Sequence, residues 1–221
     1  NKFLWSAGGW FDYLNLIING YQFHMDLTAG KVSYEDPRLD AVFDHWRELI
    51  DPGYFLEDHA SFSWQDAQAP QINGEAAMYL IGNFYVPTFE AAGIGDQMDF
   101  FQFPTIYEGV GVAEDAPTDT MHIPAGAKNV EDAKKFLAFM SNADAAVEWA
   151  KIAGMLSPNK NAPKPENRFS IMVAKMLAAA DDIAQFWDRD SNPDMASAAM
   201  EGFQEFMVKP DREDKIRARL E

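Results

Sequence analysis

The sequence has no cysteine among its 221 residues. This absence excludes disulfides, thiolate metal sites and cysteine nucleophiles, although it does not fix a cellular compartment. There is also no apolar run near the roughly 20 residues that a membrane-spanning helix requires. Basic residues are few, since 18 Lys and Arg stand against 35 Asp and Glu and the net charge is −17. Because phosphate binding needs a basic patch, we expect no nucleic-acid partner, no binding to an anionic membrane surface and no direct membrane insertion.

The start of the sequence carries no initiator methionine, no signal peptide and no lipid-anchor motif. We therefore expect the sequence to begin within a longer polypeptide. Its hydrophobic content of 48% is enough to build a real core, in one large domain or two small ones.

Motifs for cofactor and catalytic chemistry are missing as well. The four histidines share no ligand spacing and include no H-E-x-x-H. Gly93-Ile94-Gly95 lacks the third glycine of a dinucleotide fingerprint, and neither G-x-S-x-G nor G-K-[ST] occurs. Carboxylates are plentiful, so a glycosidase pair stays open, although nothing marks one pair as special. We predict no catalytic residue and no cofactor.

One acidic stretch imitates a metal-binding motif. Residues 188–194 alternate Asp and Asn as the start of a calcium loop does. The match fails at Pro193, where the turn needs glycine, and at Ala199, where a bidentate glutamate is needed. A helix cap at Asn192, followed by proline in the first helical position, explains the same residues better. We therefore predict no metal site.

The spacing of apolar residues predicts helices over much of the chain. The clearest lies at 37–50, where Asp36 is a natural cap, Pro37 suits the first position and the apolar residues form one stripe. Similar patterns predict further helices at 10–18, 64–69, 129–140, 143–153, 167–180 and 193–208. Two looser stretches, 112–119 and 158–166, are candidate crossings between domains.

A strand, turn, helix, strand order is predicted near the middle of the chain. Residues 76–81 are expected to form a buried strand, and Gly82 and Asn83 suit a tight turn into a helix. A second strand is expected at 98–103, which completes a βαβ unit and predicts an α/β fold. Ligands of such sheets bind at the turn that follows a strand, which is where Phe84 stands.

Three stretches resemble a known family. The run G-E-A-A-M-x-x-x-G-N-F at 74–84 looks like the strand, turn and aromatic signature of the extracellular solute-binding proteins of ABC sugar importers, the group that includes maltose-binding protein. Residues 123–129, followed by 131–137, look like the family's strand into a helix of the other lobe. The ending, from 186–195 to 203–207, is similar to one sugar-binding branch of that family.

The resemblance implies a type II periplasmic-binding-protein fold, present mostly as its C-terminal lobe with a segment of the N-terminal lobe. It places residues 1–117 in the first part of the C-terminal lobe and 118–165 in a crossover segment that belongs to the N-terminal lobe. Residues 166–221 would then be the closing helices of the C-terminal lobe. Family members are roughly twice this long, so the apolar stripe of the helix at 129–140 is expected to pack against a part that is missing here.

The resemblance also implies a function. It predicts the substrate-binding component of an ABC transporter, which takes a mono- or oligosaccharide into a cleft between the lobes and presents it to permease subunits of the inner membrane. Such a protein is periplasmic or extracellular and is not an enzyme. Two alternatives remain: a carbohydrate-active enzyme, glycoside hydrolase-like on an α/β fold, and an interaction module without a small ligand.

Sugars offer apolar C–H faces to aromatic rings and hydroxyls to a few placed polar groups. The predicted ligand contacts are residues of these kinds at element boundaries, namely Trp5, Trp10, Asn83, Phe84, Asp119, Trp187, Asp188 and Arg189. The resemblance favours Phe84 most, because the family commonly has a stacking tryptophan there, and phenylalanine is a departure that weakens this inference. Core packing stays an alternative for each aromatic residue. Asp188 and Arg189 could instead form a surface pair, and Asp119 could cap local backbone.

Overall fold

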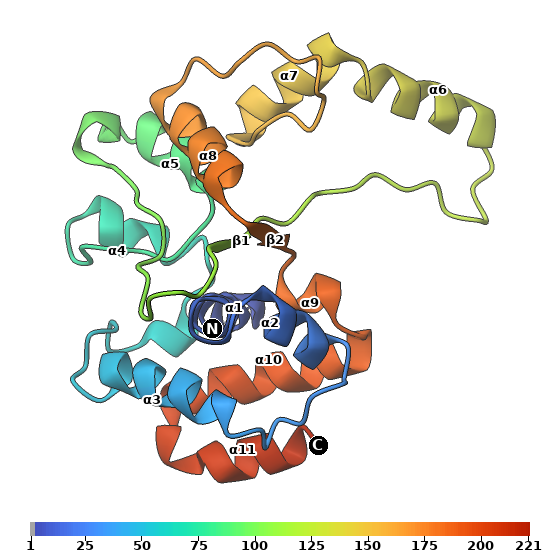
Figure 1. The fold of residues 1–221 in the computed structure, drawn as a ribbon. Helices are drawn as coiled ribbons and strands as arrows, with labels where there is room; N and C mark the ends of the chain where they lie inside the picture. The colour runs from blue at the N-terminus through green and yellow to red at the C-terminus, as the bar shows by residue number, and fades with distance from the viewer. Residues whose placement is uncertain (1–2) are drawn as a thin grey trace. The chain divides into compact units, whose positions relative to one another are not determined.

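The computed structural model describes residues 3–221 and divides the chain into two compact units (Figure 1). Unit 1 comprises Asn1–Leu80, Gln102–Pro117 and Ala179–Glu221, and unit 2 comprises Ile81–Phe101 and Thr118–Ala178. The chain therefore leaves unit 1 twice, and residues far apart in sequence build each unit.

Unit 1 is mainly helical. Its α-helices are α1 (Trp5–Asn19), α2 (Tyr21–Thr28), α3 (Arg38–Ile50), α4 (Gln68–Ile72), α9 (Trp187–Asp190), α10 (Pro193–Val208) and α11 (Glu213–Arg219), with short 3-10 turns at His59–Ser61 and Pro210–Arg212. Two short strands, β1 (Ala113–Asp115) and β2 (Asp182–Ala184), pair in parallel with Glu114 opposite Ile183. Within residues 3–221 these are the strands that form, so the fold is a helix-rich α/β arrangement.

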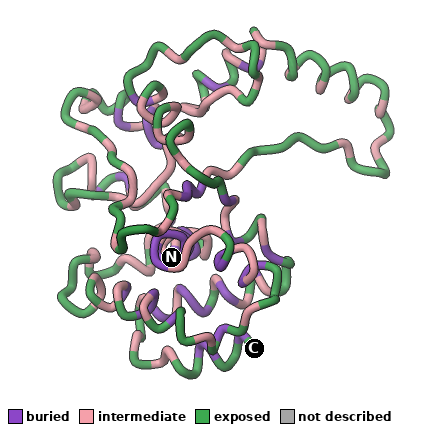
Figure 2. The backbone as a smooth tube through the Cα atoms, in the orientation of Figure 1, coloured by how far each residue is buried: buried purple, intermediate pink, exposed green. Residues whose placement is uncertain are grey.

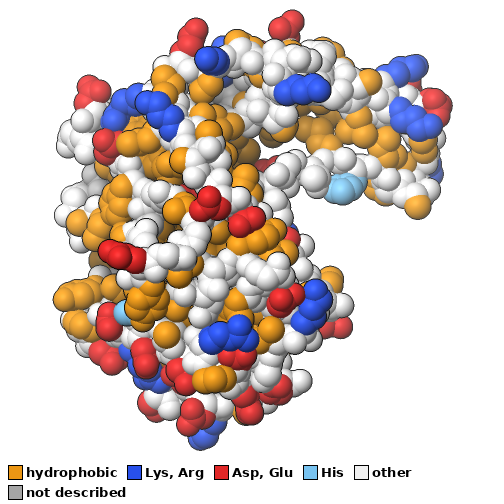
Figure 3. Space-filling model, viewed as in Figure 1, with side chains coloured by type: hydrophobic (Ala, Val, Ile, Leu, Met, Phe, Trp, Pro, Cys, Tyr) orange, Lys and Arg blue, Asp and Glu red, His pale blue; other side chains and the backbone are white. Residues whose placement is uncertain are grey.

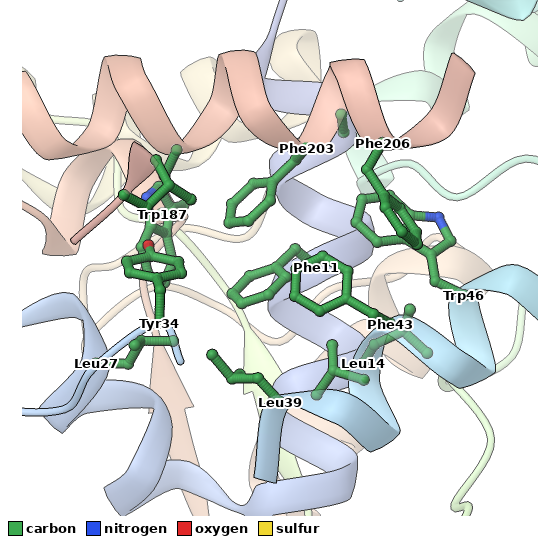
Figure 4. Packing of buried hydrophobic residues seen from close by; sticks show 14 of the residues in the cluster. Phe11, Leu14, Leu27, Tyr34, Leu39, Phe43, Trp46, Trp187, Phe203 and Phe206 are labelled. Carbon is green, nitrogen blue, oxygen red and sulfur yellow. The ribbon is translucent and has the colours of Figure 1, made fainter. Parts of the chain in front are cut away.

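The core of unit 1 lies where α1, α3 and α10 meet (Figure 4). Phe11 of α1 stacks on Phe203 of α10 with ring centroids 4.0 Å apart, and Phe43 of α3 meets Phe206 edge-on at 4.8 Å. All four side chains are fully buried. Burying one such side chain contributes about 1.5–3 kcal/mol, so these aromatic pairs contribute substantially to the stability of the unit.

Unit 2 contains α5 (Val86–Ala91), α6 (Val130–Met140), α7 (Ala143–Ala153) and α8 (Arg168–Ala179), with 3-10 turns at Asn83–Tyr85 and Gly95–Gln97. A small aromatic cluster joins α5 to α8, where Phe89 lies edge-on to Phe169 at 5.0 Å. By contrast, no residue of α6 is buried, and Figure 2 shows this helix exposed or intermediate along its length. This exposure agrees with the expectation that the apolar stripe of this helix is uncovered in these 221 residues, and the part that would cover it stays a prediction.

Several predicted helices form where their end signals indicate. The Asn192 side chain accepts from the Asp194 N–H at 2.9 Å and starts α10, with Pro193 in the first turn. Helix α7 ends at Gly154, whose φ of 68° lies in the left-handed region that glycine adopts without strain. The helices predicted at 37–50, 143–153, 167–180 and 193–208 are thus confirmed to within a residue at each end.

Three predicted strands and one predicted helix are wrong. Residues 76–81, 98–103 and 123–129 form no strand, because no neighbouring strand pairs with them in the described chain, and Met78 and Phe101 are 72% and 66% exposed. The predicted βαβ unit is therefore absent from these residues. The helix predicted at 64–69 is instead a turn, in which Ser63 and Asp66 exchange hydrogen bonds, followed by α4.

Helix α1 begins earlier than predicted, at Trp5 instead of at residue 10. Gly8 and Gly9 lie inside the helix instead of opening it. A Cβ atom at Gly9 would lie 3.4 Å from Phe186, and one at Gly8 would lie 3.5 Å from Met200. Both distances are ordinary van der Waals contacts, so the segment before α9 and helix α10 pack against α1 at these positions without requiring glycine.

Candidate functional site

A group of aromatic side chains surrounds the first turn of α1. The Trp5 ring lies 5.6 Å from Phe186, which precedes α9, and 6.3 Å from Trp64. Trp5, Trp64 and Phe186 are each partly exposed. We call these three residues the aromatic corner. A partly exposed group of rings is a surface on which the apolar face of a sugar can stack.

Trp10 lies in a second aromatic group on α1. Its ring meets Phe55 and Phe103 edge-on at 5.3 and 5.8 Å. Phe103 also stacks on Tyr13 at 5.2 Å, nearly parallel. Trp10 therefore packs against other rings. Because it is also partly exposed, ligand contact by this residue stays a prediction.

Two neighbouring carboxylates on β1 have opposite surroundings. Glu114 is buried and fully paired, because it accepts from the Tyr13 hydroxyl at 3.1 Å and from the Gln102 amide at 2.6 Å. Asp115 is also buried, at 8% exposure, yet neither of its carboxylate oxygens has a hydrogen-bond partner among residues 3–221. Burial raises the pKa of Asp115 well above its usual range, and the nearby charges of Asp190 and Asp188 raise it further.

Asp115 is the site residue that sequence analysis missed. It is the last residue of β1, and ligands of α/β sheets bind beyond the carboxyl ends of the strands. A buried acceptor without a protein partner is costly unless something donates to it. An acidic pair that ends a short strand just before a proline was the available signal, but Ala-Glu-Asp does not resemble a strand in composition.

Helix α9 brings the predicted polar contacts next to Asp115. Asp188 and Arg189 are both exposed on this four-residue helix, and both act electrostatically on Asp115. Trp187 is different, because only 1% of its surface is exposed and its ring packs edge-on against Phe11 and Phe203. The structure thus favours core packing for Trp187, and we leave it out of the proposed site.

The remaining predicted contacts belong to unit 2. The Asn83 amide donates to the Gly154 carbonyl at 2.6 Å, which ties the turn before α5 to the end of α7. The partly exposed Phe84 ring lies over Gly82, where a Cβ atom would come within 2.5 Å of it, so glycine is required there. Asp119 is exposed in a segment without regular structure. Ligand contact by these three residues stays a prediction.

Two hollows of unit 1 lack the features of a closed site for a sugar ring. A cavity beside Tyr13 and Glu114 has a volume of about 20 Å³, which is close to the size of one water molecule. A shallow hollow of about 420 Å³ over the end of α10 has no aromatic lining. Residues 3–221 also contain no group of His, Asp or Glu side chains arranged to hold a metal ion. No helix in this part of the chain has the length and apolar character that crossing a membrane demands.

Known proteins resemble this chain in sequence and in fold. The family model of the bacterial extracellular solute-binding proteins matches residues 1–181. An uncharacterized extracellular-binding protein of an ABC transporter from Pyrococcus horikoshii is 31% identical over 159 residues, which are 72% of this chain and 35% of that protein.

Among solved structures, the bacterial solute receptor AcbH, described as having an exclusive preference for β-D-galactopyranose, is 32% identical. It superposes with a TM-score of 0.86 over 97% of this chain and 56% of its own. A chitin oligosaccharide binding protein has a TM-score of 0.84 at 16% identity, with coverage of 98% and 56%. A structure described with xylan utilization by Caldanaerobius polysaccharolyticus has a TM-score of 0.80 at 19% identity, with coverage of 98% and 58%.

These likenesses confirm the predicted resemblance and the predicted type II periplasmic-binding-protein fold. The chain spans 35% of its curated relative and 56–58% of the solved structures. By its match over residues 1–181, the chain belongs to the family of bacterial extracellular solute-binding proteins.

Proposed function

We propose that the whole protein is the substrate-binding component of an ABC importer and that it binds a neutral mono- or oligosaccharide. The observation that carries this proposal is Asp115, a buried carboxylate that has no hydrogen-bond partner among residues 3–221 and lies beside the exposed Asp188 and Arg189. Sugar hydroxyls are donors that would satisfy its oxygens. The aromatic corner supplies the apolar surface that the C–H faces of a sugar need.

The charge of the site favours neutral sugars over acidic ones. Asp115, Asp188 and Asp190 lie close enough to act on one another electrostatically, and Arg189 opposes them as a single cation. A uronic acid or sugar phosphate would bring a further negative charge to these groups. The galactose preference described for AcbH, at 32% identity, makes a neutral hexose the first ligand to test.

The setting of this function is also a proposal. Membership of the family supports a protein of the periplasm or the cell exterior that delivers its ligand to permease subunits of the inner membrane. We propose binding without catalysis, because the relatives are solute receptors. The competing hypothesis is a glycoside hydrolase in which Asp115 and a carboxylate of α9 act as the catalytic pair.

The test is calorimetric titration of the full-length protein with galactose, glucose, xylose, a chitin oligosaccharide and galacturonate. We expect a neutral sugar to bind and, at one hundred times Kd, to stabilise the protein by about 2.7 kcal/mol. Trp5→Ala should weaken this binding by about 1–1.5 kcal/mol, whereas Tyr54→Ala, at a residue of unit 1 that is 75% exposed, should leave it unchanged.

Three results would contradict the proposal. Absence of heat and of thermal shift with every neutral sugar would remove the sugar function. Preferential binding of galacturonate would reverse the charge argument. Steady release of product from an aryl glycoside, lost in Asp115→Asn, would favour the hydrolase.

A further inference from the structure

A row of buried polar side chains crosses unit 1 beneath α9. At one end, the Asn19 amide donates both to the Arg38 carbonyl at 3.1 Å and to the Asn15 side-chain oxygen at 2.9 Å. A carbonyl can only accept, so the orientation of the Asn19 amide is fixed, and the Asn15 oxygen must face it. The Asn15 amide nitrogen therefore faces Nδ1 of His24, at 3.2 Å, and donates to it. His24 consequently carries its proton on Nε2.

The other end of the row reaches α9. Nε2 of His24 faces Oδ1 of Asp12 at 3.9 Å, and Oδ2 of Asp12 accepts from the backbone N–H of Trp187 at 2.9 Å. Both Asp12 and His24 are completely buried. Neither Nε2 of His24 nor Oδ1 of Asp12 has a hydrogen-bond partner elsewhere in the described part of the chain. The two oxygens of the Asp12 carboxylate thus face different groups: Oδ2 accepts from the Trp187 N–H, and Oδ1 faces Nε2 of His24.

This carboxylate holds the beginning of α9. Trp187 is the first residue of that helix, and the first N–H groups of a helix have no partner within it. Asp12, on α1, supplies the missing acceptor from 175 residues away in sequence. Because α9 has only four residues and carries Asp188 and Arg189, the direction of its first turn sets where these two side chains lie.

We propose that Asp12 is a positioning residue for the sugar site, and that Asn15 and His24 orient its carboxylate toward the Trp187 N–H. Asp12 contacts no ligand in this scheme. It acts through α9, on the exposed Asp188 and Arg189. The effect on sugar affinity rests on the proposed function, whereas the effect on the Trp187 N–H does not.

The test exchanges the carboxylate at position 12 with the amide at position 15, first one residue at a time and then both together. In Asp12→Asn, the new amide oxygen can still accept from the Trp187 N–H. The amide nitrogen then faces the Nε2–H of His24, and two hydrogen-bond donors lie opposite each other. In Asn15→Asp, the new carboxylate draws the His24 proton to Nδ1, so a lone pair on Nε2 faces the Asp12 carboxylate. The double variant restores the pattern in reverse, with Nε2 accepting from position 12, and keeps the net charge.

Two quantities are measured in the full-length protein: hydrogen exchange of the Trp187 amide by NMR, and Kd for the cognate sugar. We expect each single variant to speed exchange and weaken binding by roughly ten- to one hundredfold. The double variant should recover most of both losses. Asp211→Asn makes the same chemical change at an exposed residue of the turn before α11 and should alter neither quantity. Phe206→Leu controls for lost packing, since it should lower the melting temperature without the change in Trp187 exchange.

Additive losses in the double variant would overturn the proposal, because they would mean that the residues act only through packing. Unchanged Trp187 exchange in Asp12→Asn would overturn it as well. If the wild-type protein binds no sugar, the proposed function falls, and the exchange measurement alone then supports or overturns the role of Asp12 in positioning α9.

Discussion

Helix α6 has an apolar stripe and a charged face, whereas α1 is apolar around most of its circumference, and the two helices have very different surroundings. Ten of the fifteen residues of α1 are buried, because α2, α3 and α10 of unit 1 pack around it. None of the eleven residues of α6 is buried, and in unit 2 it packs only lightly on α7. Figure 3 shows hydrophobic side chains gathered on the surface of α6, where Phe136 and Phe139 are 56% and 59% exposed. The pattern of a helix therefore predicts which face is apolar but not whether a partner covers it.

We propose that the apolar face of α6 and α7 is covered in the whole protein by residues outside these 221. The relatives that this chain matches are longer, since it spans 56% of the AcbH chain. The predicted assignment of 118–165 to the N-terminal lobe stays a proposal, since unit 2 combines Thr118–Ala178 with Ile81–Phe101.

The largest expected effect on stability comes from replacing a phenylalanine with alanine in the core of unit 1, compared with the same replacement on α6. Phe203→Ala should lower the free energy of unfolding by about 3–5 kcal/mol, because it opens a cavity beside Phe11 and Trp46. Phe139→Ala on α6 should change it by no more than about 0.5 kcal/mol. Denaturant unfolding of this 221-residue chain measures both. Equal losses would break the comparison, since they would mean that α6 is already covered.

A pH effect is expected in the core of unit 1. Burial lowers the pKa of His24 from 6.5 to about 4, so the folded state binds fewer protons than the unfolded state between these values. Stability should therefore be full above the unfolded pKa and fall as the pH drops toward 4, by at most about 1.4 kcal/mol per pH unit.

Unfolding at about pH 7 and about pH 5 measures this effect. Relative to the wild type, His24→Asn should gain less stability between about pH 5 and about pH 7, because it removes the titrating ring, while the raised pKa values of Asp12 and Asp115 act with the opposite sign in both proteins. An unchanged difference in the variant would assign the acid sensitivity to another group.

The two carboxylates of β1 give a matched pair of variants. Asp115→Asn should stabilise the protein by about 1–2 kcal/mol at neutral pH, because it removes a buried charge without a partner, and should abolish detectable sugar binding. Glu114→Gln should instead destabilise it by about 1 kcal/mol, because it disturbs the bonds to Tyr13 and Gln102.

The sign of the Asp115 effect follows from its raised pKa. The folded state holds the proton more tightly, so the wild type loses stability as the pH rises through the folded pKa. The gain in Asp115→Asn should therefore grow with pH. A gain that shrinks with rising pH, or a variant that is less stable at neutral pH, would mean that the Asp115 carboxylate has a partner.

The smallest effect concerns association. Ile152 and Trp149 on α7 are 75% and 52% exposed, and a contiguous apolar face of this kind promotes weak self-association. Sedimentation of the 221-residue chain should reveal it at high concentration, and Ile152→Lys should reduce it. A chain that stays monomeric at all concentrations would contradict the proposal that this face is covered in the whole protein.

Sequence patterns predicted best the elements whose signals are local. Asn192 and Gly154 mark the ends of α10 and α7 because capping needs only neighbouring residues. The strands failed for the opposite reason. Each of β1 and β2 has three residues, and their pairing joins positions 69 residues apart, such as Glu114 and Ile183. Nothing in their composition predicts pairing with a strand that far along the chain.

The site was predictable in part for the same reason. Trp5 and Trp10 stand out as boundary aromatics, and the structure leaves both partly exposed. Trp187 carries the same local signal, yet α10 and α1 enclose it. Asp115 carries no local signal, since its lack of a partner is a property of the folded surroundings.

The stack of Phe11 on Phe203 also limits how early the core of unit 1 can form while the chain is being made. The two rings are 192 residues apart in the chain and lie on the first and one of the last helices of unit 1. A ribosome that adds about 5–20 residues per second takes roughly 10–40 s to make the intervening chain. Throughout that interval Phe11, Leu14 and Phe43 lack the helix that buries them. These apolar side chains therefore stay exposed to aggregation until α10 is available to bury them, during synthesis and after export alike.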